Sequence, residues 1–416
     1  MSIRNKHDKT TYETRLKLIL ELSKKISSTL DIDSLLELIM QTTRKFIHYD
    51  SAGIYILDPA RPGQIRAHKV KGYDSETYSR FKIGVGIVGW VVKTGFATIV
   101  PDVHKDKRYV AVRASTRSEL VVPIRINGKV IGAFNLESDQ VNAYTKSDLD
   151  LLLFFASYVA ISIEKVLLHE ALMEKKRLEA ELAVARRVQQ SLLPKSTPQF
   201  GRFDIAGINH PIEEVGGDYF DYLQFSEEKM GIVVADVAGK GVPAALIMAS
   251  FRAMLRAQLC DDCPPAKAFC KLNMLLGESN VDDRYVTAFY MELRKDSYLL
   301  RYINAGHNPP VLIRSDNSWL RLDSSDTVLG LLPAVQYREI LHEVSAGDMI
   351  IIYTDGLTDT LSEDEETNVS KVVEVAIKNR HLPAKNLVDE IYSATSKFKT
   401  CDTIEDDCTL VVVKIS

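Results

Sequence analysis

Four short segments of the C-terminal half place aspartates at the ends of apolar, strand-like runs. The carboxylates concerned are Asp218, Asp236, Asp355 and the adjacent pair Asp406 and Asp407. One aspartate beside a glycine is usually a turn residue, because its side chain binds nearby backbone amides and tolerates unusual dihedral angles. Four acidic strand ends in one region are harder to explain in this way, and they predict a cluster of carboxylates.

A cluster of this kind favours divalent cations. Carboxylates gathered in a partly buried site repel one another, and their pKa values rise unless cations neutralise them. Hard oxygen ligands favour magnesium or manganese over zinc. Two such ions roughly 3.5–4 Å apart can activate a water molecule and stabilise the attacking and leaving oxygens of a phosphoryl transfer. The pattern is typical of a hydrolase that needs no protein nucleophile.

Other phosphate chemistries lack the residues that they require. The sequence contains no Cys-x5-Arg motif, which a cysteine phosphatase needs for its thiolate and its phosphate-binding loop. It also contains no GxxxxGK(S/T) motif, because residues 238–241 lack the upstream glycine and the following hydroxyl residue. Hydrolysis by bound water therefore remains.

The elements that must position these aspartates are strands followed by glycine turns. Asp236 follows the apolar run 231–235, and Pro243 suits the first turn of a helix after the glycine turn. Asp355 follows a similar apolar run at 349–353 and precedes another glycine. Both segments predict a buried strand that delivers a carboxylate to a turn.

Three other polar residues leave alternatives open. His307 is either a proton donor to the leaving serine alkoxide or part of a turn after a strand, in the run His-Asn-Pro-Pro. Arg252 and Arg256 either clamp the phosphate or lie on an exposed face of the helix after Pro243. Each alternative predicts a different exposure and different partners for the side chain.

Several motifs occur in a characteristic order along this half: AxxVQQSLLP (185–194), VGGDYFD (215–221), VVADVAGKGVPAAL (233–246), YVTAFY (285–290), YINAGHNPP (302–310), LGLLP (329–333), YTDGLTD (353–359) and DDCTL (406–410). With them, residues 184–416 resemble the bacterial PPM-type serine/threonine phosphatases of the sporulation and stress-regulator class. The resemblance implies an αββα sandwich, in which helices cover two β-sheets, and two Mn²⁺ or Mg²⁺ ions. It also implies a phosphorylated protein substrate of the STAS-type anti-sigma-factor-antagonist class.

The same resemblance implies a set of metal ligands. Asp218 and Asp236 would hold the metal pair, and the backbone carbonyl of Val237 would assist. Asp355 and Asp406 would bind the second ion. Asp407 is the alternative to Asp406, because the two carboxylates are adjacent in the sequence.

The N-terminal half changes period from helical to strand-like. A helix is expected from about Asp33, and short strands at 52–57, 64–71 and 97–100 lead to a hairpin whose turn is Asn127-Gly128. Residues 33–165 resemble a GAF sensory domain, which implies a pocket for a small regulatory molecule, although such domains also serve only for dimerisation. No residue here names the ligand.

A long helix should connect the two halves. Thr145 and Asp148 have the spacing of a helix-capping pair, and Pro194 ends the helix. Apolar residues then recur three and four apart, imperfectly at two polar positions, in the series Leu168, Ala171, Lys175, Leu178, Leu182, Ala185, Gln189 and Leu192. This heptad seam favours a parallel dimeric coiled coil, and the alternative is one exposed helix lying on its own domain.

Length and composition agree with an α+β chain of several parts. At 416 residues the chain exceeds one usual hydrophobic core, and 46% apolar residues suffice for two. We expect an N-terminal helix in 1–32, a GAF domain in 33–165, a helical coiled-coil linker in 166–194 and a phosphatase domain in 195–416.

The net charge and the termini bear on partners and location. A net charge of −4 gives no general attraction to nucleic acid or to anionic membranes. The N-terminus has no apolar signal segment, and no run of eighteen apolar residues occurs, so a cytoplasmic protein is expected. The five cysteines are expected to be reduced thiols, including Cys260 and Cys263, because zinc-ligand spacing is lacking.

The sequence therefore predicts a metal-dependent protein serine/threonine phosphatase regulated through its N-terminal half. A class III nucleotide cyclase is one alternative, because it also uses two aspartates on strands, but it leaves Asp355 and Asp406 unexplained. A catalytically inactive signalling or binding module is the other. All four proposed ligand side chains are acidic, which disfavours that reading.

Overall fold

The computed structural model describes residues 24, 31–73, 80–279, 284–323, 326–358, 365–398 and 406–416. The helix expected in residues 1–32 lies almost entirely outside them. The chain divides into two compact units, Met1–Arg177 and Leu178–Ser416.

The N-terminal unit contains one antiparallel sheet of six strands, in the order β3-β2-β1-β6-β5-β4. Their bounds are β1 Ser51–Leu57, β2 Gln64–Lys71, β3 Arg80–Lys82, β4 Thr98–Val100, β5 Ser118–Ile126 and β6 Lys129–Ser138. The hairpin between β5 and β6 turns through Asn127 and Gly128, with φ angles of 49° and 80°. Both are the positive angles of a tight type I′ turn, so the predicted hairpin is confirmed.

Helices cover both faces of this sheet. Residues of α2 (Ile32–Arg44) and of the first part of α4 (Lys146–Leu192) pack in one core, against side chains such as Ile54, Val122 and Phe134. The other face packs against α3 (Gly86–Thr94), through residues such as Val91 and Ala133. A short 3-10 helix, η2 (Val103–Lys105), follows β4.

The connecting helix α4 runs without interruption from Lys146 to Leu192. Its start is capped as predicted: the Thr145 hydroxyl donates to Asp148 at 2.7 Å, and the Asp148 amide donates back to that hydroxyl at 3.4 Å. By length and composition, one window of α4 could cross a membrane. However, its Leu152, Phe155 and Val159 are buried in the core of the N-terminal unit.

The C-terminal unit contains two sheets. The first has the order β15-β12-β11-β10-β9, and the second has the order β14-β13-β16-β17-β8-β7. The strands of the first sheet are β9 Tyr219–Gln224, β10 Lys229–Val237, β11 Val286–Arg294, β12 Leu299–Ala305 and β15 Ile340–Glu343. Those of the second are β7 Gln199–Phe200, β8 Phe203–His210, β13 Val311–Ile313, β14 Trp319–Arg321, β16 Met349–Tyr353 and β17 Cys408–Ile415.

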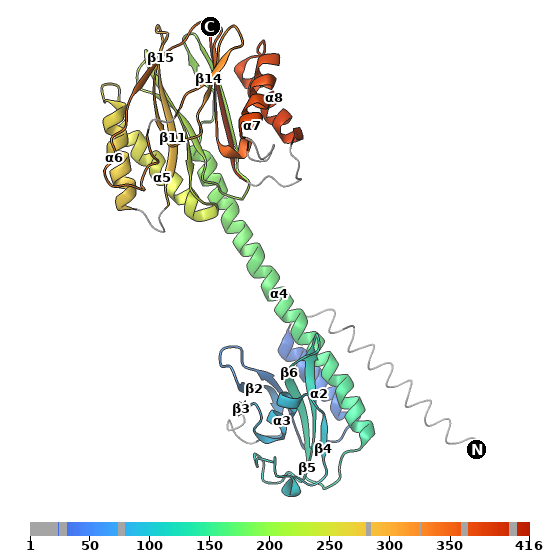
Figure 1. The fold of residues 1–416 in the computed structure, drawn as a ribbon. Coiled ribbons are helices and arrows are strands. Elements are labelled where there is room, and N and C mark those ends of the chain that lie inside the picture. Colours follow the sequence, from blue (N-terminus) through green and yellow to red (C-terminus); the bar gives the residue numbers. More distant parts are fainter. Residues whose placement is uncertain are drawn as a thin grey trace, which may run out of the picture. The chain divides into compact units, whose positions relative to one another are not determined.

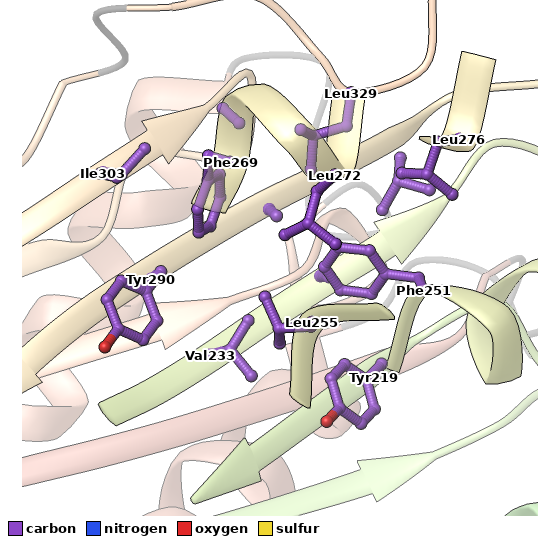
Figure 2. Packing of buried hydrophobic residues seen from close by; sticks show 14 of the residues in the cluster. Tyr219, Val233, Phe251, Leu255, Phe269, Leu272, Leu276, Tyr290, Ile303 and Leu329 are labelled. Carbon is purple, nitrogen blue, oxygen red and sulfur yellow. The ribbon is translucent and has the colours of Figure 1, made fainter. Parts of the chain in front are cut away.

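Helices cover the outer faces of both sheets (Figure 1). On one side, α5 (Gly241–Gln258) and α6 (Pro265–Glu278) bury Phe251, Phe269 and Leu272 against the first sheet, as Figure 2 shows. On the other, α7 (Glu365–Lys378) and α8 (Ala384–Phe398) pack on the second sheet. The predicted αββα sandwich is therefore confirmed, and a third core lies between the sheets.

The loop after α5 corrects one expectation. Cys260 and Cys263 form a disulfide, whereas we expected reduced thiols. Their Cα atoms are 5.1 Å apart, within the range that a disulfide spans, because the chain turns between the two helices. Among the cysteines that the structure describes, Cys270 forms no disulfide.

Candidate active site

Alternation along the strands brings the acidic residues to one end of the sandwich. In β10, Ile232 and Val234 face the core between the sheets while Val233 and Ala235 face the helices, so Asp236 continues the inward-facing row. The same two-residue period turns four further side chains inward, because each lies two or four positions from an inward-facing residue of β9, β16 or β17. They are Asp218, Thr354, Asp407 and Thr409. Segments distant in the sequence thus meet at one edge.

Asp218 lies at the buried centre of this end. Its Oδ2 accepts hydrogen bonds from the hydroxyls of Thr354 at 2.8 Å and of Thr409 at 2.7 Å. Burial and the neighbouring carboxylates of Asp236 and Asp407 raise the pKa of Asp218 well above its usual value, while the Thr409 bond opposes the rise. Both threonines belong to the second sheet, so they tie that sheet to a carboxyl that directly precedes a strand of the first sheet. The sequence pattern did not identify them.

Asp236 experiences the charges of the other acidic strand ends. Burial, followed by the charges of Asp355, Asp406 and Asp407, raises its pKa to about 7, and a hydrogen bond with Asp218 opposes the rise. Asp355 begins the 3-10 helix η3 (Asp355–Leu357) directly after β16 and is half-buried. The electrostatic coupling means that the predicted aspartates lie near one another.

The adjacent aspartates before β17 have different environments. Asp407 is 6% exposed, and its two oxygens accept the amides of Ile212 at 2.8 Å and Gly217 at 2.7 Å. The Asp406 side chain is 40% exposed and lies 3.2 Å from the Lys240 ammonium. Asp407 therefore holds the loop before Asp218 in place, while Asp406 faces outward beside a cation.

Two glycines make these close approaches feasible. A Cβ atom on Gly216 would overlap the carboxylate of Asp407, and one on Gly356 would overlap the Asp407 carbonyl oxygen. Gly217 also lies close to the site, because a Cβ there would be 2.9 Å from the Val237 carbonyl oxygen. The paired glycines before Asp218 are thus required by packing as well as by the turn.

The described residues contain no group of three or more His, Cys, Asp or Glu side chains in a geometry that would hold a metal ion. Two of the predicted ligands have other partners, since Asp218 accepts from two hydroxyls and Asp406 pairs with Lys240. The donor chemistry nevertheless fits cations. Asp218 is a buried carboxyl and Asp236 a half-buried one, and repulsion from neighbouring carboxylates contributes to the raised pKa of each, which a divalent ion would relieve.

His307 is a buried neutral residue. It is 2% exposed, its Nδ1 lies 2.9 Å from the hydroxyl of Thr287, and burial lowers its pKa to about 4. It therefore carries no proton to donate as an imidazolium at neutral pH. The turn interpretation fits better, because its backbone amide donates to Asn304 at 2.8 Å.

Of the two alternatives for the arginines of α5, the contacts do not support the phosphate clamp. Arg256 donates to the buried Asp221 at 2.8 Å, and Arg252 donates to the Leu192 carbonyl oxygen at 2.8 Å, so both have partners outside the acidic cluster. Arg284, which sequence reasoning missed, donates to the Ala238 carbonyl oxygen at 3.3 Å beside the glycine turn. A Cβ atom on Gly239 would overlap its guanidinium.

The end of α4 contacts the loop that carries Asp218. The Gln189 side chain donates to the Gly216 carbonyl oxygen at 2.6 Å and accepts the Gly216 amide at 3.1 Å. This explains why a polar residue interrupts the heptad series at this position. Leu182 and Ala185 are half-buried, whereas Leu168 and Leu178 are exposed.

Known proteins resemble both halves. The family model described as Stage II sporulation protein E matches residues 226–416, and a GAF domain model matches residues 29–164. Phosphoserine phosphatase RsbU of Bacillus subtilis (strain 168) is 30% identical over 245 residues, covering 58% of this chain and 71% of that protein. The chain belongs to the RsbU family of serine phosphatases.

Other similarities agree with this family. Phosphoserine phosphatase RsbP of Bacillus subtilis (strain 168) is 27% identical over 190 residues, 44% of this chain and 47% of that protein. The SiaA-PP2C domain of Pseudomonas aeruginosa shares the fold, with a TM-score of 0.51 and 18% identity over 58% of this chain and 99% of that one. The chain is a protein serine/threonine phosphatase with an N-terminal GAF domain, which disfavours the nucleotide-cyclase alternative.

Proposed function

We propose that residues 195–416 hydrolyse phosphoserine or phosphothreonine on a partner protein with a water molecule activated by two Mn²⁺ or Mg²⁺ ions. The observation that most supports this proposal is the crowding of negatively charged carboxylates around Asp236. Its pKa is raised to about 7 by burial and by three neighbouring carboxylates, and that repulsion calls for bound positive charge.

The proposed ligands are Asp218, Asp236, Asp355 and Asp406, with the backbone carbonyl of Val237. Bound divalent ions would lower the pKa of a water molecule and neutralise charge on the phosphoryl group. Asp236 would help to hold the ions, because its pKa responds to the charges of Asp355, Asp406 and Asp407. Thr354 and Thr409 would orient Asp218 through the hydrogen bonds that its Oδ2 accepts.

Asp406 fits the ligand role better than Asp407. Both oxygens of Asp407 accept backbone amides. Asp406 is partly exposed; one of its oxygens accepts the Asp407 amide at 3.0 Å, and the other lies 3.2 Å from the Lys240 ammonium. Lys240 would release Asp406 when a cation arrives and would then be available to a phosphate oxygen. These contacts support Asp406 as the proposed ligand.

The test is hydrolysis of a phosphorylated protein substrate by the full chain with manganese, with chelator, and with Asp236→Asn. We expect turnover to require metal and to be lost in the variant. Asp296→Asn is a matched control, since that side chain is 83% exposed on the same unit. Undiminished turnover by Asp236→Asn would overturn the metal assignment.

The proposed substrate is a small phosphoprotein of the STAS-type anti-sigma-factor-antagonist class. Its support is the family membership together with the motifs at both ends of the phosphatase unit. Comparing the phosphoproteomes of cells with and without this protein would name the substrate, which should gain phosphate in the deletion strain. A set of accumulating phosphoproteins without any such antagonist would contradict this part.

The proposed regulation runs from residues 33–165 through the helix 166–194 to the phosphatase domain, in a cytoplasmic homodimer paired by that helix. Gln189 supports the route, because its two hydrogen bonds hold Gly216, two residues before Asp218. Exposed Leu168, Leu172 and Leu178 support pairing in the N-terminal part of the seam.

Replacing Gln189 tests this route in the full chain. Gln189→Leu should change turnover and its response to dilution, because the loop that carries Asp218 loses both hydrogen bonds. Gln190→Leu is the matched control, since the neighbouring side chain is exposed on the same helix. Equal behaviour of the two variants would contradict the route.

A further inference from the structure

Two glutamates lie directly opposite each other in the interior of the N-terminal sheet. Glu119 on β5 pairs in register with Glu137 on β6, and the two residues are only 4% and 5% exposed. Like charges directly opposite on neighbouring strands are destabilising, and buried charges without a counter-ion are more so. Asn135, two residues before Glu137, shares their face of the sheet and is 2% exposed.

Glu137 is well satisfied by hydroxyl groups. One of its oxygens accepts from Ser51 at 3.0 Å and from Thr116 at 2.6 Å, and the other accepts from Tyr73 at 3.0 Å. These donors stabilise a carboxylate without neutralising its charge. Glu137 is therefore held in place as a fixed negative charge.

Glu119 has a different environment. Among the described residues its hydrogen bond is a long one of 3.3 Å from the Asn135 amide, and the Asn135 Oδ1 atom is buried without a partner. Burial, followed by the charge of Glu137, raises the pKa of Glu119 well above its usual value. No ion pair joins either glutamate to a basic side chain in the part of the chain that the structure describes.

Arg108, the basic residue whose charge acts on Glu119, already has other partners. Arg108 binds Asp106 at 2.6 Å, and its guanidinium lies 4.3 Å from the centre of the Trp90 ring. Its charge lowers the pKa of Glu119, but this effect is smaller than the opposing effects of burial and of the Glu137 charge. The negative charge of the two glutamates is therefore only weakly offset by Arg108.

A small cavity opens onto these side chains. Glu119, Asn135 and Glu137 line one side of it. The other walls come from the first turn of α3 and from the segment 109–112, through Gly86, Ile87, Val88, Tyr109, Val110 and Val112. The cavity therefore has an acidic, hydrogen-bonding base and largely apolar walls.

We propose that this cavity binds a small molecule through a protonated primary amino group held by the Glu119 carboxylate and the Asn135 carbonyl oxygen. Glu137 supplies a second negative charge behind them. An ammonium group presents three donors, which match an oxygen of each carboxyl or amide that faces the cavity. The proposal deepens the regulatory role proposed for residues 33–165, and it rests on that role only for an effect on turnover.

The same geometry disfavours a divalent metal as the occupant. Calcium takes six to eight oxygen ligands and magnesium demands an octahedron, whereas this cavity offers two carboxylates, one of which already accepts four hydrogen bonds. The cavity has a volume of about 20 Å³, which is room for an ammonium group, and the carbon chain of an organic amine would lie over the exposed rim at Val110. The first amides of α3 have no partner within the helix, so they could also bind the carboxylate of a free amino acid.

Calorimetric titration of the full chain tests the site. The probes are the individual proteinogenic amino acids, butylamine, potassium chloride and magnesium chloride, each compared with the N-acetylated form of the best binder. We expect an amino compound to bind, its N-acetyl form not to bind, and Glu119→Gln to weaken binding about tenfold or more. Amino acids that bind where butylamine does not would place the carboxylate at α3.

Controls separate the site from the fold and from the phosphatase. Glu164→Gln removes a half-buried acid of the same unit, away from the cavity, and should bind as the unaltered chain does. Val110→Phe should block the half-exposed rim while keeping both glutamates, and the melting temperature of each variant without ligand reports folding. Asp236→Asn should bind the amine normally even if it has no phosphatase activity, so failure of one proposal leaves the other testable. No binding by any amine, or equal binding by Glu119→Gln, would overturn the proposal.

Discussion

The chain gathers buried carboxylates in two places, and it builds them differently. In the phosphatase unit, the acids stand at strand ends beside glycines, where the backbone turns and two sheets meet. In the N-terminal unit, Glu119 and Glu137 sit within neighbouring strands, opposite each other. The first arrangement draws carboxylates from several strands onto one centre, whereas the second presents a pair at the base of a cavity. A divalent ion needs more oxygen ligands around it than an organic cation does, and the two sites differ in this number.

The largest expected effect separates Asp406 from its neighbour. Asp406→Ala should reduce turnover by more than about 100-fold, because even residues behind a metal ligand cost about 10–100-fold when removed. Its folding stability should change little, since the side chain is 40% exposed. Steady-state kinetics and thermal unfolding of the variant check both statements. Normal turnover would instead indicate that Asp407 is the metal ligand.

Asp407→Ala should act mainly on stability. It leaves the amides of Ile212 and Gly217 without their acceptor, and each buried unsatisfied donor costs about 1–3 kcal/mol. We therefore expect the free energy of unfolding to fall by about 2–4 kcal/mol in urea titrations. Asp407→Asn keeps one acceptor oxygen and should fall less. Equal, small losses in both variants would contradict the structural role.

The pH dependence of stability should follow Asp236. Its pKa is raised to about 7 in the folded chain, so the folded state binds the proton more tightly than the unfolded state does. Without metal, this contribution to stability is present below about pH 4 and is lost as the pH rises toward about 7. Added manganese should consequently raise the melting temperature more at about pH 8 than at about pH 5. Scanning calorimetry at both values checks this, and Asp236→Asn should lose much of the difference.

The smallest effect should come from the N-terminal pair. Glu119→Gln removes one of two opposed acids while keeping the hydrogen bond from Asn135 in reach, so the free energy of unfolding should stay equal or rise by about 1 kcal/mol. The comparison with Asp407→Ala is informative, because both residues are buried acids but only Asp407 has its two oxygens satisfied by backbone amides. A loss of several kcal/mol would show that Glu119 is structural.

The sequence predicts the phosphatase site better than the cavity, for physical reasons. Aspartates beside glycines at the ends of apolar runs are visible in a linear pattern, and so are the strands that carry them. The αββα layers, the capped start of α4 and the Asn127-Gly128 hairpin are local or periodic features, and each is confirmed.

Contacts that depend on strand register or on the packing of distant segments could not be predicted from the linear sequence pattern. Glu119 and Glu137 oppose each other only because the β5–β6 hairpin aligns them, and their spacing in the sequence does not reveal this. The roles of Thr354 and Thr409 depend on two sheets meeting, and the contact of Gln189 depends on where α4 ends. Likewise, the disulfide between Cys260 and Cys263 depends on a turn whose shape the spacing alone did not decide.

The most direct test of the central claim is the number of manganese ions that the full chain binds in a calorimetric titration near neutral pH. We expect two ions per chain, fewer in Asp236→Asn and Asp406→Asn, and an unchanged two in Glu119→Gln. Two ions in every variant, or none in the unaltered chain, would contradict a metal pair held by Asp218, Asp236, Asp355 and Asp406.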